Sequence, residues 1–220
     1  RLLDVTRLSD PQGFLPYPAT RPTDRLLTGA DLDPESFRRL DDGSFWIGEE
    51  FLPSLVHINA DGEMLAPPFT LDGLAAKGNP AGKPATLGRS KGFEGMAVSA
   101  DGKRLYPMLE GKLSGAGQAL NIYTFDLQTR QFSNPHANRP SYRYRLDEDA
   151  TAMGDFSMYS DSAGLVIERD SRENDEASLK KVYKVDFTQL DADGFLIKTE
   201  VADLLDIEDP HDLNRDGDLN

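Results

Sequence analysis

Short runs that alternate apolar and polar residues, each closed by a turn signal, dominate the chain. Residues 35–40 and 44–50 are two such runs, and the Asp42-Gly43 turn between them is typical of a β-hairpin. A third run, residues 55–59, leads into a second turn at Asp61-Gly62. No comparable stretch carries a sustained 3.6-residue apolar period, so helices are expected to be few. The pattern therefore predicts an all-β chain.

The same order of strands and turns returns twice further along the chain. Each copy begins with an acidic residue, and these residues lie 59 and 61 positions apart: Glu35, Glu94 and Asp155. Each copy also has an acidic residue at the end of its next strand, at spacings of 60 and 58 positions: Glu50, Glu110 and Glu168. Landmarks that recur together indicate a true repeat of about 60 residues.

A unit of several antiparallel strands cannot bury both of its faces alone, so the copies are expected to stack. The spacing accommodates the four strands of a β-propeller blade with long connecting loops. We predict one domain over 1–220, divided into a Pro-rich segment (1–30), blades near 31–92, 93–151 and 152–200, and the start of a further blade (201–220). Propellers close with about four to eight blades. The expected fold is therefore a β-propeller that is incomplete in this chain.

Composition narrows the classes of partner. The formal net charge of −14 disfavours binding to nucleic acid or to an anionic membrane, because both would be repelled. No run of 18 or more apolar residues is present, so membrane insertion is not expected. The absence of cysteine excludes disulfides, thiolate nucleophiles and zinc–thiolate sites.

The acidic residues at the blade starts are the first candidate ligands. The first strand of each propeller blade lines the central channel, so Glu35, Glu94 and Asp155 are expected to converge near the axis. Clustered carboxylates repel one another unless a cation lies among them, and hard oxygen ligands suit calcium. Alternatively, each acid accepts backbone hydrogen bonds at the start of its own strand.

The second set of repeated acids supplies candidates for a further ligand and a general base. Glu50 is a candidate metal ligand, although Glu49 competes with it, because alternation along a strand lets only one of the two point inward. Glu110 and Glu168 are candidate general bases. The alternative for this set is a carboxylate that anchors a loop and pairs with a neighbouring Arg or Lys.

Cationic residues adjoin the repeated acids. Lys91 precedes Glu94, Arg169 follows Glu168, and Lys181 lies in the third copy. These three are candidate phosphate-binding residues, and Arg169 is also a candidate catalytic residue. Surface charges that only keep the protein soluble are the alternative. Separately, Asp212–Asp218 matches the first half of a calcium-binding loop, with a plain acidic turn as the alternative.

Several of these segments together resemble a known family, named phytase-like or "esterase-like activity of phytase". The resemblance runs from about Gly29 to about Pro210 and rests on these segments: 28–37, 43–51, 92–102, 105–111, Gly154-Asp155-Phe156 and 165–170. It implies a secreted or periplasmic bacterial β-propeller, with calcium dependence and phosphate-ester hydrolysis as expected properties.

The leading hypothesis is a calcium-dependent phosphomonoesterase acting on a small-molecule phosphate ester. Calcium would be held by the blade-start acids, Lys91 and Arg169 would bind phosphate oxygens, and Glu110 or Glu168 would act as general base. One alternative is a metal-dependent lactonase, similar to the gluconolactonase group, which needs no cationic cluster. The other is a non-enzymatic binding module of the bacterial envelope with structural calcium.

Overall fold

The computed structural model describes residues 5–136 and 139–208. Its regular elements are 14 β-strands and two short 3-10 turns, η1 (Asn174–Glu176) and η2 (Leu204–Asp206). The all-β prediction is therefore confirmed. No helix in the described part is long and apolar enough to cross a membrane.

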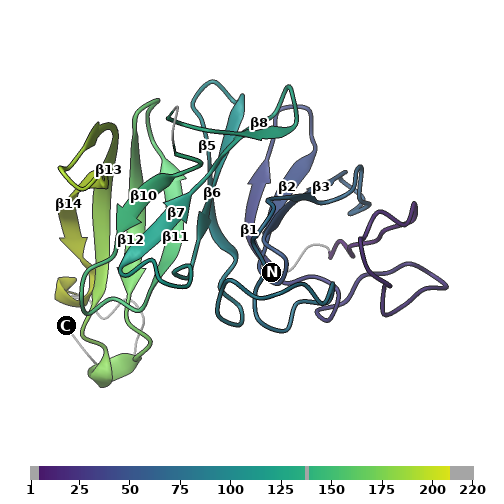
Figure 1. The fold of residues 1–220 in the computed structure, drawn as a ribbon, viewed down its shortest axis with the longest axis horizontal. Coiled ribbons are helices and arrows are strands. Elements are labelled where there is room, and N and C mark those ends of the chain that lie inside the picture. Colours follow the sequence, from purple (N-terminus) through teal and green to yellow (C-terminus); the bar gives the residue numbers. More distant parts are fainter. Residues whose placement is uncertain (1–4, 137–138, 209–220) are drawn as a thin grey trace.

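The strands form three antiparallel sheets, one for each copy of the repeat (Figure 1). The first sheet has the order β1-β2-β3-β4 and consists of β1 (Pro34–Arg39), β2 (Phe45–Glu49), β3 (Ser54–Ile58) and β4 (Phe69–Thr70). The third has the order β11-β12-β13-β14 and consists of β11 (Ala152–Met158), β12 (Ala163–Arg169), β13 (Lys180–Leu190) and β14 (Leu196–Asp203). Both are four-stranded meanders, the pattern of a propeller blade.

The second sheet follows the same plan with its outer strands broken. It contains β5 (Phe93–Val98), β6 (Arg104–Leu109), β7 (Ala119–Ile122), β8 (Thr124–Asp126), β9 (Gln131–Ser133) and β10 (Tyr142–Arg145). Both β7 and β8 pair with β6, and both β9 and β10 lie at the outer side. The break between β7 and β8 falls opposite Pro107 of β6, which has no N–H to donate to a neighbouring strand.

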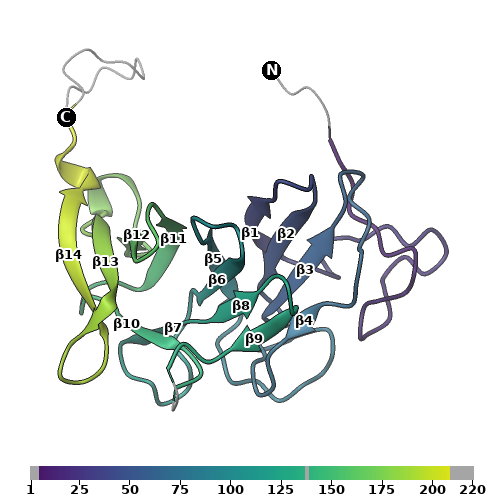
Figure 2. The same cartoon turned by 90° about the horizontal axis from the view of Figure 1, so that it is seen from above.

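The three sheets stack face to face in an arc, with inner strands β1, β5 and β11 side by side (Figure 2). Side chains such as Trp46, Phe93 and Phe125 fill the space between the first and second sheets. Tyr144 and Phe156 do so between the second and third sheets. The arrangement is that of a β-propeller, and its described part does not close into a ring.

The structure adds detail at both ends of the predicted domain. The Pro-rich segment (1–30) packs on the first sheet, where its Leu15, together with Leu32, joins Ile47 and Val56 in a third core cluster. Val201 lies in β14, the outer strand of the third sheet, so the third blade extends past its predicted end at residue 200. The predicted Asp212–Asp218 loop lies outside the described residues.

Candidate functional site

A β-bulge recurs at the same point in each blade. The pairing of the first two strands shifts register between Pro34 and Ser36, between Phe93 and Gly95, and between Met153 and Asp155. A bulge leaves one residue unpaired and redirects its side chain. The unpaired residues in the three blades are Glu35, Glu94 and Gly154.

This register corrects the third copy of the predicted repeat by one residue. Gly154, not Asp155, is equivalent to Glu35 and Glu94. Asp155 pairs with Ile167 instead, and its side chain is 55% exposed beside Arg38, at 3.7 Å. The structure therefore does not bring Asp155 to the other predicted metal ligands, because the strand alternation turns it away from the bulge position.

The same correction applies at the ends of the second strands. Glu49, Leu109 and Glu168 are equivalent, because each pairs with the residue before the bulge. The next residue along each strand is then Glu50, Glu110 or Arg169. The third blade thus places an arginine where the first two blades place a carboxylate.

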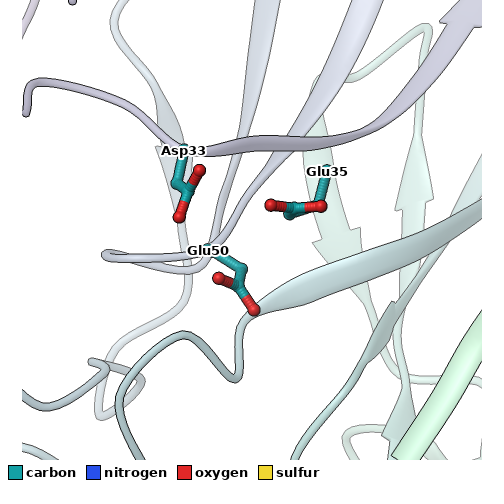
Figure 3. Close-up of side chains that lie close together, drawn as sticks. All are labelled: Asp33, Glu35 and Glu50. Carbon is teal, nitrogen blue, oxygen red and sulfur yellow. The ribbon is translucent and has the colours of Figure 1, made fainter. Parts of the chain in front are cut away.

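Carboxylates of the first two blades gather into two groups that share Glu50. Oxygens of Glu50, Glu94 and Glu110 lie within 4.8 Å of one another. Oxygens of Asp33, Glu35 and Glu50 meet the same limit and lie grouped between neighbouring segments of the ribbon (Figure 3). Four of these acids were predicted to take part in the site. Asp33 was not, although its place two residues before Glu35 could have indicated it.

Burial and mutual repulsion make these carboxylates unusually basic. Burial, followed by the charges of Glu110 and Glu35, raises the pKa of Glu50 to about 8. The same causes raise the pKa of Glu94 to about 7, although Arg169 and Lys91 oppose the shift. Burial and Asp33 raise the pKa of Glu35 as well. Such a cluster favours either protons or a bound cation.

Two cationic side chains, those of Arg169 and Lys91, contact this cluster at Glu110. Arg169 Nη2 lies 2.8 Å from Glu110 Oε1, and Lys91 pairs with Glu110 Oε2. Arg169 comes from the third blade, so the cluster draws on all three sheets. Gly154 lies beside the stem of this arginine, since a Cβ atom at Gly154 would be 3.7 Å from Arg169 Cδ.

Glu49 and Glu168 anchor loops and do not belong to the cluster. Glu49 accepts backbone N–H bonds from Phe51 and Leu52, both at 2.8 Å. Glu168 is 0% exposed and accepts hydrogen bonds from the Tyr144 hydroxyl, the Lys198 ammonium and the Asp147 backbone. An enclosed carboxylate with three donors cannot reach a substrate. The structure therefore does not support Glu168 as the general base.

Lys181 is also kept away from the cluster. Its ammonium pairs with Glu200 at 2.9 Å and with Asp203 at 3.6 Å, both on the adjacent outer strand β14. Of the three predicted phosphate-binding cations, the structure brings together Lys91 and Arg169 only.

Gly92 sets how closely the first two blades approach at the site. A Cβ atom at this position would lie 2.3 Å from the Glu50 carbonyl oxygen and 2.5 Å from its Cα. The Gly92 carbonyl also accepts the N–H of Glu110 at 2.8 Å. Backbone on both sides leaves no flexible side chain that could move aside.

Replacing Gly92 with alanine is expected to destabilise the protein by about 1–3 kcal/mol, because it overpacks a blade contact. Denaturant unfolding measures this loss. Gly29→Ala is the matched control, since no atom lies within 4 Å of its added Cβ and it should be nearly silent. Equal stability of the two variants would contradict the close blade contact.

Comparisons with known proteins identify the family of the chain. No curated protein sequence matches the chain. A solved structure titled "Structure of U3-55K" aligns with a TM-score of 0.41 and 16% identity, over 77% of this chain and 39% of that one. A puromycin hydrolase aligns with a TM-score of 0.37 and 10% identity, over 78% and 21%. The chain thus spans well under half of these proteins.

A family model gives the more specific result. The model described as "Phytase-like: Esterase-like activity of phytase" matches residues 1–217. Its match covers the three blades, both carboxylate groups and the two cations at Glu110. The chain therefore belongs to the phytase-like family.

Proposed function

We propose that the protein is a calcium-dependent phosphoric-ester hydrolase of the bacterial envelope that acts on a small-molecule phosphate ester. The observation that carries this proposal is the meeting of Glu50, Glu94 and Glu110 with the cations of Lys91 and Arg169. The donors for a hard metal ion and those for a phosphate group adjoin at a single carboxylate. Family membership supports the hydrolytic class.

The residues present fit calcium. Glu50 is 3% exposed, and neither Glu50 nor Glu94 forms an ion pair with any residue that the structure describes. Their oxygens are hard donors, and calcium takes six to eight such oxygens in flexible geometry. Asp33 and Glu35 add further carboxylate oxygens next to Glu50.

Each residue would have a distinct task in the hydrolysis. Calcium held by Glu50, Glu94 and Glu110 would polarise a phosphoryl oxygen and make a bound water more acidic. Arg169 would orient the phosphate, because its planar guanidinium matches two oxygens at once, and Lys91 would add a point charge. Glu94 would accept the proton of the attacking water through the carboxylate oxygen that calcium leaves free, since neither of its oxygens is ion-paired with a described residue.

Turnover of the full-length protein on a phosphate monoester and on a lactone tests this proposal. We expect hydrolysis of the phosphate ester in calcium, reduced at least about tenfold by a chelator. Calcium-dependent turnover of the lactone alone would contradict it and assign a lactonase. Calcium-dependent stability without turnover of either substrate would assign a binding module.

A further inference from the structure

Glu110 stands between the acidic and the basic halves of the site. We propose that, in the free protein, Glu110 occupies the oxyanion-binding groups of Lys91 and Arg169, and that a divalent cation bound at Glu110 frees them for a phosphate-type ligand. Cation and oxyanion then bind cooperatively. This inference rests on the proposed function, which it deepens by linking the two ligands.

In the free protein, Glu110 already occupies the two basic side chains, Lys91 and Arg169. Arg169 binds one oxygen of Glu110 and Lys91 binds the other, so a single carboxylate satisfies both cations. Neither cation pairs with any other acid in the described ranges. Their side chains are 36% and 38% exposed, so an incoming ligand can reach them. Such a ligand must compete with Glu110, which is almost fully buried and held in place.

The carboxylate group shows how a divalent metal ion would release Lys91 and Arg169 from Glu110. Glu110 shares its group with Glu50 and Glu94, within 4.8 Å. A divalent cation in this group would draw on the oxygens of Glu110 and place positive charge next to both basic side chains. With every carboxylate ionised, the three carboxylates and the two basic side chains carry one net negative charge, and a bound divalent cation changes this to one net positive charge. The ionised free group therefore repels an oxyanion, and the loaded group attracts it.

The third blade differs from the other two at the site, and this difference places the oxyanion-binding group next to the third blade. Arg169 occupies the position that holds Glu50 and Glu110 in the other blades, and Gly154 removes the bulge carboxylate. A strict repeat would have placed a carboxylate at both of these positions in the third blade. The observed chain instead presents a guanidinium beside a carboxylate group, the asymmetry that a cation–oxyanion pair requires.

Linkage between the ligands makes the proposal measurable. If calcium tightens oxyanion binding by some factor, the oxyanion must tighten calcium binding by the same factor. Methylphosphonate, a soluble phosphate analogue that cannot be hydrolysed as an ester, is the probe. Calorimetric titration of the full-length protein should show a methylphosphonate Kd at least about tenfold lower in calcium than in chelator. The reverse titration should show an equal gain for calcium.

The Glu110→Gln variant distinguishes coupling through Glu110 from independent binding of the cation and the oxyanion. Without a charge at residue 110, the two cations are released, so methylphosphonate should bind the calcium-free variant more tightly than the calcium-free wild type. Lys91→Met is the second variant, and it should retain calcium binding while losing most of the coupling. Lys103→Met removes an exposed lysine that, among the described residues, pairs with Asp101 alone, and it should leave the coupling unchanged.

Two results would overturn the proposal. One is a wild-type methylphosphonate Kd that is equal in calcium and in chelator. The other is weaker methylphosphonate binding by folded Glu110→Gln than by wild type, both free of calcium. These binding results are independent of turnover: coupling without hydrolysis would refute only the proposed activity, and hydrolysis without coupling would refute only this inference.

Discussion

Phosphate-ester turnover is expected to fall at least about tenfold when Arg169 is replaced with lysine. The charge is kept, but the planar fork that matches two phosphate oxygens is lost. A tenfold loss corresponds to about 1.4 kcal/mol of transition-state stabilisation. Steady-state kinetics in calcium measure the change.

The matched control for this variant is Arg172→Lys. Arg172 is exposed and pairs with Asp170 in a loop of the same blade, at 3.1 Å. Its replacement should leave turnover within twofold of the wild type. A normal rate in folded Arg169→Lys would show that Arg169 only pairs with Glu110, and would remove it from the substrate site.

The second large effect concerns stability in the absence of metal. Without divalent cations, the melting temperature should fall as the pH rises from 6.5 to about 8. The pKa of Glu94 is raised to about 7 and that of Glu50 to about 8 in the folded protein, against an ordinary value of 4.5. The folded state therefore holds protons that the unfolded state has released.

The sign of this effect follows from proton linkage. Stability from these two groups is fully present below pH 4.5 and is lost as the pH rises through their folded pKa values. For each proton that only the folded state retains, the free energy of unfolding falls by up to about 1.4 kcal/mol per unit rise in pH. His57, whose pKa is lowered by burial, acts in the opposite direction, but only below its ordinary value of 6.5.

Thermal unfolding in chelator at several pH values measures this slope. Saturating calcium should flatten it, because a cation replaces the protons between the carboxylates. A melting temperature that stays level or rises between pH 6.5 and 8 in chelator would contradict the buried, mutually repelling cluster.

The fold was predictable from sequence because its signals are local and repeated. Asp-Gly turns, alternating strands and a period near 60 residues all describe backbone that each blade forms within itself. The covering of the first sheet by Leu15 and Leu32 was not predictable, because those contacts join loops to a sheet without any periodic pattern.

The site was predictable in part, and the errors have one physical cause. The spacing selected Glu35, Glu50, Glu94 and Glu110, whose carboxylates lie grouped in the structure, but the third copy was read one residue out of register. An acid at Asp155 resembles the expected residue, whereas only strand pairing reveals that Gly154 holds the bulge. A shift of one residue turns every side chain to the other face. Asp155 and Glu168 were therefore assigned to a site that neither enters.

The central claim is that carboxylates of the first two blades form a divalent-cation site. The most direct test is the melting temperature at pH 7.5 with and without calcium, for the wild type, Glu94→Gln and the exposed control Glu148→Gln. A ligand that binds only the folded state stabilises it by mass action. We expect calcium to raise the melting temperature of the wild type and of Glu148→Gln, and to leave that of folded Glu94→Gln nearly unchanged. A wild-type melting temperature that does not respond to calcium would contradict the account.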